Sequence, residues 1–262
     1  MANPIAPSIT QNGRIEPFGL QLSRGQIFGH SVIHVFGHNP DVDQTEVTIW
    51  PALGLLGHPA SPTIMKISSS NANDASAGTG ARTVYVLGIN GTGGYASEIV
   101  TLNGQTEVNT VHEYDAIERL SVVSVGSGGV NAGIIYAGTG TVTTGVPAVP
   151  YSAIGIGDNL SLVGHWTCPT GYTGYLTTGS ITSGNTTGSQ YITARLKQRG
   201  QDGIVRTAAI ATLHQSSVDY DFSYPVKILE GECITATAKG SGSNNDVSSY
   251  FQIVLIKNDG SL

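Results

Sequence analysis

Apolar and polar residues alternate with a period of two along much of the chain. Near the C-terminal end, Phe251, Ile253 and Leu255 fall on every second position. Ile192 and Ala194 begin a similar run in the segment 190–199. Because successive side chains of a strand point to opposite faces, this period predicts strands with one face in a core. We therefore expect an all-β protein in which no helix is needed.

Short segments of this kind alternate with glycine and asparagine turns between residues 63 and 144. The dipeptides Asn90-Gly91 and Asn103-Gly104 tolerate positive φ angles and predict tight hairpins. Short strands at such close spacing are typical of a small antiparallel sandwich or barrel. The predicted strands are Thr63–Ser68, Arg82–Ile89, Ser97–Asn103, Gln105–Thr110, Ala116–Val125 and Gly133–Thr143.

A second set of strands is predicted from Tyr151 onward. The spacing of these segments fits a jelly-roll-like sandwich of antiparallel strands. Pro147 and Pro150 precede the set and favour an extended linker over residues 146–150. The predicted strands are Asn159–Cys168, Gly174–Thr182, Gln190–Arg199, Ile204–Leu213, Ser217–Phe222, Val226–Leu229, Cys233–Lys239 and Ser248–Lys257.

Residues 1–62 are rich in proline, which removes a ladder donor and favours extended or edge conformations. We interpret this segment as an extended arm with short strands around Gln26–Phe36 and Glu46–Trp50. The expected organisation is thus an arm (1–62), a small β-sandwich (63–145), a linker (146–150) and a jelly-roll-like β-sandwich (151–262). On this interpretation, a chain without residues 1–60 keeps both sandwiches folded but loses its attachment contacts.

Charged residues make up only 11 % of the chain, against roughly a quarter in an average soluble domain. A surface with so few charges favours a protein that buries much of it in a larger assembly. The net charge of −6 argues against binding of nucleic-acid backbones, which requires clustered Lys and Arg. We also expect no membrane contact and no signal peptide, because the chain has no long apolar run and no basic, apolar leader.

Three histidines, His30, His34 and His38, recur every four residues. The segment reads as a strand, where residues four apart lie about 13 Å apart, too far to share one metal ion. Asp41 and Asp43 resemble the start of a calcium loop, but the later positions of an EF-hand are wrong. We therefore predict no metal site.

Carboxylates two residues apart could in principle cleave glycosides as an acid and a base. Such pairs are Glu113 and Asp115, Asp219 and Asp221, and Glu230 and Glu232. All lie near predicted strand ends, where solvated carboxylates are the ordinary interpretation. The sequence also has no nucleophile elbow, phosphate loop or dinucleotide fingerprint. We therefore predict no catalytic residue and no cofactor, and hence no enzyme.

Three further groups have both structural and functional interpretations. Cys168 and Cys233 are expected to be buried free thiols, with a single disulfide as the alternative. The basic residues Arg195, Lys197 and Arg199 would share one strand face, solvated or salt-bridged. Aromatic residues could form a sugar platform or belong to the core. These aromatics are Trp166, Tyr172, Tyr175, Tyr191, Tyr220 and Tyr224.

Six segments carry a recognisable pattern, namely Phe18–Gly25, Ile33–Asp43, Ala77–Thr83, Glu98–Gly104, Gly128–Gly133 and Trp166–Tyr175. Together they resemble a family of virion structural proteins from tailed phages of marine bacteria. The resemblance covers about residues 18–258, with Cys168 and Thr170 departing from the family pattern at the start of the second sandwich.

The resemblance implies a non-enzymatic virion component that is assembled in the bacterial cytoplasm. We expect a capsid decoration or cement protein that contacts the head through its arm and strand edges. Its expected partners are the major capsid protein or other virion proteins and further copies of itself. The alternative is a tail, neck or fibre component that contacts the host surface, with glycan binding by the second sandwich.

Overall fold

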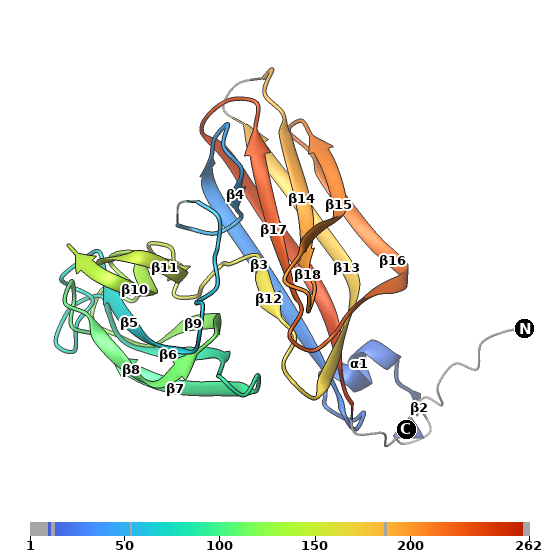
Figure 1. Ribbon diagram of the computed structural model, residues 1–262, viewed down its shortest axis with the longest axis horizontal. Helices are drawn as coiled ribbons and strands as arrows, with labels where there is room; N and C mark the ends of the chain where they lie inside the picture. Colours follow the sequence, from blue (N-terminus) through green and yellow to red (C-terminus); the bar gives the residue numbers. More distant parts are fainter. Residues whose placement is uncertain (1–9, 12–13, 53, 186–187, 259–262) are drawn as a thin grey trace, which may run out of the picture.

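The computed structural model describes residues 10–11, 14–52, 54–185 and 188–258. It confirms an all-β protein built from antiparallel sheets. Two units with separate cores lie side by side, a tall sandwich and a smaller central unit (Figure 1). Within the described residues, no helix has the length and apolar character needed to cross a membrane.

The sandwich consists of two sheets that face each other across one apolar core. One sheet has the order β16-β13-β18-β3, and the other has the order β12-β17-β14-β15, with β4 also paired to β17. Val35, Leu176 and Phe251 are among the residues that fill the space between the sheets. The strands are β3 (His30–Val42), β4 (Val47–Thr48), β12 (His165–Thr167), β13 (Tyr172–Asn185), β14 (Ile192–Arg199), β15 (Val205–Leu213), β16 (Ser217–Ile228), β17 (Cys233–Gly240) and β18 (Asn245–Lys257).

Strands β4 and β12 form two halves of one edge strand. Thr48 pairs with Thr237, and His165 pairs with Thr235 on the same side of β17. The chain leaves the sandwich after β4, forms the whole central unit, and re-enters the sandwich at β12. The central unit is therefore an insertion into the sandwich.

This pairing corrects the prediction of an N-terminal arm. The 13-residue strand β3 pairs with β18 along nearly its full length, with Phe36 opposite Tyr250. Pro40 is tolerated because β3 is the last strand of its sheet, where a missing N–H breaks no ladder. The described part of the predicted arm is thus an integral part of the sandwich, and residues 1–9 lie outside the described residues.

A short helix, α1 (Phe18–Ser23), precedes β3 and corrects the expectation that no helix is needed. It follows Pro17, whose φ of −58° suits the start of a helix. Leu22 is buried, and the side-chain amide of Gln21 donates to the carbonyl of Glu16. The helix is preceded by the small hairpin β1 (Thr10–Gln11) and β2 (Arg14–Ile15).

The central unit has two sheets around a second core, with the orders β11-β10-β5-β8 and β7-β6-β9. All six predicted strands are present, with bounds shifted by a few residues. Asn90 closes the β6–β7 hairpin, whereas Asn103 and Gly104 connect strands of different sheets. The strands are β5 (Thr63–Ser69), β6 (Ala81–Ile89), β7 (Tyr95–Thr101), β8 (Val108–Tyr114), β9 (Ala116–Val125), β10 (Ile135–Thr143) and β11 (Val146–Ile154).

The predicted linker over residues 146–150 is wrong, because these residues belong to β11. Thr144 and Gly145 both have positive φ and form a two-residue turn between β10 and β11. A side chain at Gly145 would lie 1.8 Å from the carbonyl oxygen of Ser69, so glycine is required there. Pro147 and Pro150 are accommodated because β11 is an edge strand.

A buried carboxylate holds the long loops of the central unit in place. Asp74 accepts hydrogen bonds from the backbone N–H groups of Ala81, Ala132 and Gly133 at 2.7–2.8 Å. It also accepts one from the hydroxyl of Ser69 at 2.6 Å. A carboxylate can be buried when hydrogen-bond donors replace its water, and this one joins residues far apart in the sequence.

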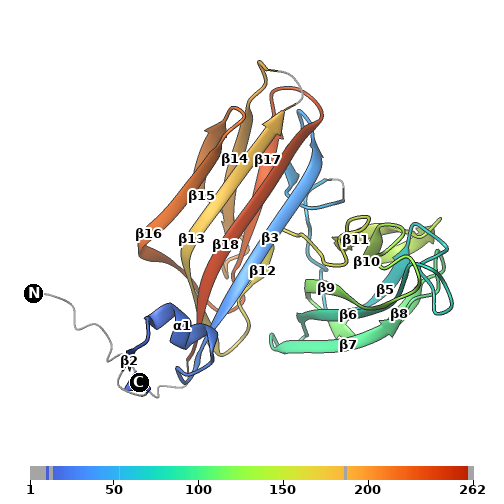
Figure 2. The same ribbon diagram turned by 180° about the vertical axis from the view of Figure 1, so that it is seen from behind.

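The two units are joined by a small apolar cluster and by polar contacts. Trp50, just after β4, is buried with Tyr136 and Ala153 of the central unit. The indole N–H of Trp166 donates to the hydroxyl of Tyr95 at 3.2 Å. Figure 2 shows the central unit beside the β3 and β12 edge of the sandwich, with β15 and β16 on the opposite side.

Candidate functional site

The free edge of the sandwich is formed by β15, on the side away from the central unit (Figure 1). This strand has nine residues, and from Thr207 to Leu213 it has neither a charged residue nor a proline. Ile210 is 59 % exposed. A bare edge presents backbone N–H and C=O groups to which another strand can pair.

The other long edges of the sandwich are blocked. On β3, the guanidinium of Arg119 donates to the carbonyl of His34 at 2.9 Å, and the N–H of His38 donates to Leu162. On β16, the register with β13 shifts between Asp221 and Val226, and Pro225 lies within this stretch. Prolines and irregular register hinder pairing of a further strand.

The strand β15 has no proline, but its register with β14 shifts at Ala208 and the hydroxyl of Tyr220 donates to the carbonyl of Ile210 at 3.5 Å. Apart from β3, whose edge is contacted as described above, β15 is the one sandwich edge among the described residues with a long run free of both charge and proline, from Thr207 to Leu213.

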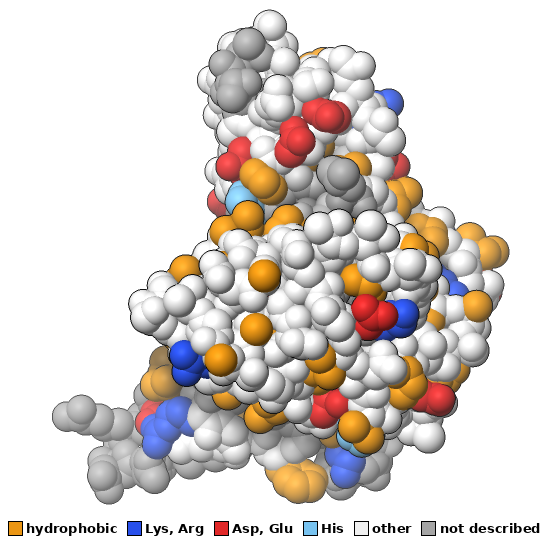
Figure 3. Space-filling view, turned by 90° about the vertical axis from the view of Figure 1, so that its left-hand side faces the viewer, with side chains coloured by type: hydrophobic (Ala, Val, Ile, Leu, Met, Phe, Trp, Pro, Cys, Tyr) orange, Lys and Arg blue, Asp and Glu red, His pale blue; other side chains and the backbone are white. Residues whose placement is uncertain are grey.

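A broad face of the central unit is almost uncharged. Residues 120–157, which include β10 and β11, contain no Asp, Glu, Lys or Arg. Figure 3 shows this side of the molecule as mostly neutral polar surface with scattered apolar side chains and few charges. Such a face has little charge to desolvate when another protein covers it.

The three regularly spaced histidines do not meet. His34 bonds to the hydroxyl of Tyr250 at 2.9 Å, and His38 bonds to a carboxylate oxygen of Asp246 at 3.0 Å. His30 bonds instead to the backbone carbonyl of Phe28. Each histidine therefore has its own partner, as expected for residues spaced along a strand.

The carboxylate pairs serve turns or point into solvent. Glu230 accepts from the N–H of Gly171, and Glu232 accepts from the N–H of Leu229, both at 2.8 Å. Asp219 and Asp221 lie on the exposed face of β16. Glu113 is exposed on β8, and partial burial raises the pKa of Asp115. Asp43, from the segment that resembles the start of a calcium loop, accepts a hydrogen bond from the backbone N–H of Asn244.

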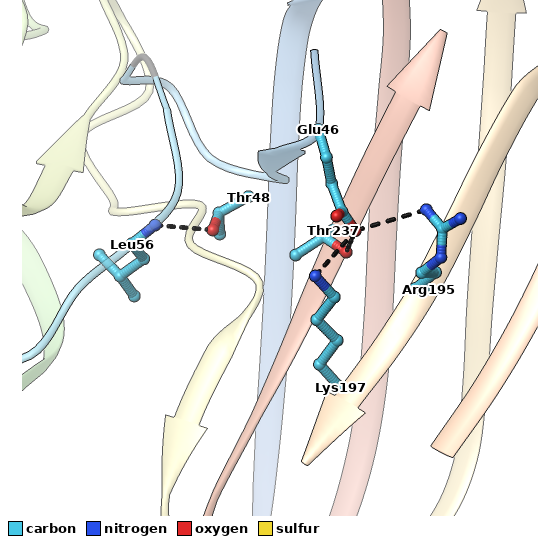
Figure 4. A network of polar contacts seen from close by, with 6 residues as sticks. All are labelled: Glu46, Thr48, Leu56, Arg195, Lys197 and Thr237. Carbon is cyan, nitrogen blue, oxygen red and sulfur yellow. Dashed lines mark hydrogen bonds and ion pairs between the residues drawn. The ribbon is translucent and has the colours of Figure 1, made fainter. Parts of the chain in front are cut away.

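Two of the three basic residues of β14, Arg195 and Lys197, are ion-paired on the outer face of the sandwich, and Arg199 lies beside His58 and Cys233. Figure 4 shows Glu46 between Arg195 and Lys197, with nitrogen–oxygen distances of 3.4 and 2.9 Å. Glu46 also accepts from the hydroxyl of Thr237 at 2.7 Å. Burial raises the pKa of Glu46, but these partners outweigh it and lower the pKa overall.

The aromatic residues do not share one platform. Trp166 is buried in the sandwich core, and Tyr220 stacks on Phe222. Tyr224 is 93 % exposed within the register break of β16. Cys168 and Cys233 are buried free thiols.

A cluster that the sequence did not predict lies where the chain crosses between the units. His58 follows β4, His165 begins β12, and Cys233 begins β17. One ligand atom from each of the three lies within 4.8 Å of the others. The Nε2 atom of His58 is 3.5 Å from the Sγ atom of Cys233, and the two imidazole rings are 5.0 Å apart.

Each ring nitrogen of His165 has a threonine hydroxyl beside it. Nδ1 is 2.8 Å from the hydroxyl of Thr235, and Nε2 is 3.1 Å from that of Thr167. A groove of about 320 Å³ opens beside the cluster and is lined by His58, Cys233 and Arg199 among others.

Burial disfavours the charged forms of all three side chains. Desolvation lowers the pKa of His165 well below its usual value, and the neighbouring His58 and Arg199 lower it further. The pKa of His58 is also lowered, by burial and by Arg199. Burial, with the charge of Glu118, raises the pKa of the Cys233 thiol to about 11.

No protein-family model matches the chain, and no match is found among curated proteins. The resemblance to tailed-phage virion proteins therefore stays a prediction. Among solved structures, the chain is similar to a chain in the structure of infectious bursal disease virus Gx strain. The sequence identity is 11 %, the match covers 89 % of this chain and 74 % of the viral chain, and the TM-score is 0.24. The chain is also similar to the VP2 subviral particle of infectious bursal disease virus, with 11 % identity over 88 % of this chain and 73 % of that one, at a TM-score of 0.24. A TM-score this low does not establish a common fold.

Proposed function

We propose that this chain is a non-enzymatic virion structural protein of a tailed phage, of the type that decorates and stabilises the head. The observation that carries the proposal is the free edge of β15, which has no charged residue and no proline from Thr207 to Leu213. Soluble monomers usually protect such an edge with charges, prolines or irregular register. An edge left bare is suited to pairing with a strand of a neighbouring protein.

The strand order of the sandwich supports the same role. With β4 and β12 counted as one strand, the two sheets have the orders 6-3-8-1 and 2-7-4-5 in chain numbering. This is the arrangement of a jelly roll, an architecture that is common in viral capsid proteins and also occurs in lectins. Fold alone does not fix function, and we take the edge and the uncharged face as support for the capsid role.

In this proposal, β15 pairs with β15 of a second copy of the chain. The uncharged face of the central unit, which includes β10 and β11, rests on the major capsid protein. The described part of the predicted arm is used inside the sandwich, so attachment depends on strand edges and faces. The scattered aromatic residues do not favour the alternative of a glycan-binding tail or fibre component.

Copy number in purified phage particles tests the proposal. The particles are digested and the peptides of this chain are counted against those of the major capsid protein by quantitative mass spectrometry. A head decoration protein should be present in hundreds of copies, as expected from a capsid lattice. A few to a few dozen copies would indicate a tail or neck component, and absence from the particle would contradict a virion role.

A further inference from the structure

We propose that His58, His165 and Cys233 bind a zinc ion at the point where the chain crosses between the sandwich and the central unit. Zinc is commonly held by imidazole nitrogens and thiolate sulfur in tetrahedral sites. Ligand types of this softness favour zinc over magnesium or calcium, which prefer oxygen.

The distances within the cluster fit this coordination. Tetrahedral zinc with Zn–N bonds near 2.0 Å and a Zn–S bond near 2.3 Å places nitrogen and sulfur about 3.5 Å apart. The Nε2 atom of His58 and the Sγ atom of Cys233 are separated by 3.5 Å. The ligand atom of His165 completes a set that lies within 4.8 Å. A modest rotation of the imidazole rings would bring all three to one ion.

The surroundings of His165 suit a ligand. In zinc sites, the ring nitrogen that does not bind the metal usually donates its proton to a nearby acceptor, which fixes the orientation of the ring. Thr235 and Thr167 place a hydroxyl oxygen beside each nitrogen. Whichever nitrogen binds the metal, the other retains an acceptor.

Zinc binding by these three residues depends on their protonation states. Zinc binds the unprotonated nitrogen of an imidazole and the thiolate form of a cysteine. The thiol of Cys233 has to lose its proton when the metal binds, which makes binding weaker at low pH. The groove beside His58 and Cys233 leaves a fourth position for water.

Such a site would tie together three parts of the molecule. His58 belongs to the segment that leaves the sandwich, His165 to the segment that returns, and Cys233 to β17, which pairs with both halves of the split edge strand. The ion would therefore fix the crossing at which the central unit is inserted.

Zinc and cobalt titrations of the full-length reduced protein test the site. We expect one zinc ion per chain by calorimetry, and a thiolate-to-cobalt charge-transfer band when Co²⁺ is added. His58→Ala and Cys233→Ser should each weaken zinc binding by at least about tenfold, as loss of a ligand requires. Cys233→Ser should also abolish the charge-transfer band.

Cys168→Ser is the matched control, because Cys168 is equally buried but contacts the carbonyl of Tyr172 instead of the histidines. It should leave both zinc affinity and the cobalt band unchanged. His58 is only half-buried, so His58→Ala decides the question if Cys233→Ser does not fold. A His58→Ala variant with unchanged zinc affinity, or a folded wild-type chain that gives no cobalt–thiolate band, would overturn the proposal.

Discussion

The backbone N–H of Gly164 donates a hydrogen bond to the carbonyl oxygen of Ile49 across 2.9 Å. This contact joins the segment that leaves the sandwich to the segment that returns to it. Ala236 of β17 completes the arrangement, since its N–H donates to Gly164 and its carbonyl accepts from Ile49. The N-terminal segment is thus part of the sandwich.

Deletion of residues 1–60 should therefore unfold the sandwich. The deletion removes β3 and β4, leaves β18 paired only with β13 and takes Val35, Val42 and Ile49 from the core. We expect thermal unfolding, followed by circular dichroism, to lose the cooperative transition of the sandwich. A chain that begins at Thr10 retains β3, β4 and α1 and should unfold like the full chain. A fragment 61–262 with the melting temperature of the full chain would refute the insertion.

Asp74→Asn should destabilise the central unit. The carboxylate accepts hydrogen bonds on both oxygens, and an amide nitrogen in place of one oxygen would face donors instead of accepting from them. We expect a loss of about 2–4 kcal/mol in the free energy of unfolding, measured in urea. Asp158→Asn, at an exposed carboxylate, should change it little. Equal effects of the two substitutions would argue against a structural role of Asp74.

Glu118 should make stability depend on pH. Burial raises the pKa of this carboxyl to about 8 in the folded protein, above its ordinary value of 4.5, although hydrogen bonding to Thr167 lowers it in part. The folded state therefore holds a proton that the unfolded state releases, so its contribution to stability is complete below pH 4.5 and is lost as pH rises toward 8. The slope for one proton is at most about 1.4 kcal/mol per pH unit.

Glu118→Gln removes this titration while keeping an oxygen that can accept from the N–H of Thr167. We expect the free energy of unfolding of the variant to fall less steeply than that of the wild type between pH 5 and pH 8, roughly the range between the two pKa values. Urea unfolding at each pH measures this slope. Glu113→Gln, at an exposed carboxylate, is the control and should keep the wild-type slope. An unchanged slope in Glu118→Gln would show that Glu118 is ionised throughout.

Ile210→Lys should weaken self-association. A lysine on an edge strand hinders strand addition, and two facing copies of β15 would bring like charges together. We expect sedimentation velocity to show a shift toward monomer at concentrations where the wild type associates. Ile156→Lys is the control, because Ile156 is similarly exposed, at 66 %, but lies outside the strands. If both variants associate as the wild type does, β15 is not the contact.

Much of the fold can be predicted from the sequence, because many residues determine the conformation of their own segment of the chain. The alternation of apolar residues gave most strands, and Asn90 marked a hairpin by its turn chemistry. Strand β11 was missed because its turn, Thr144-Gly145, is not one of the common hairpin dipeptides and its prolines suggested a linker. Prolines are equally compatible with an edge strand, and only the pairing partners distinguish the two cases.

The insertion and the cluster of His58, His165 and Cys233 depend on long-range pairing. The prediction placed residues 1–62 in an arm because proline content is a local property, whereas the pairing of β3 with β18 spans nearly the whole chain. The three residues of the cluster are distant in the sequence and have no motif spacing. They meet only because both crossings between the units pass beside β17.

A density map of the intact phage particle, obtained by electron microscopy, would show where the chain lies and which surfaces it uses. We expect the chain on the head, with β15 paired antiparallel to β15 of a neighbouring copy and the β10–β11 face of the central unit against the capsid shell. Density that places the chain on the particle with β15 open to solvent in every copy, or particles without the chain, would contradict this expectation.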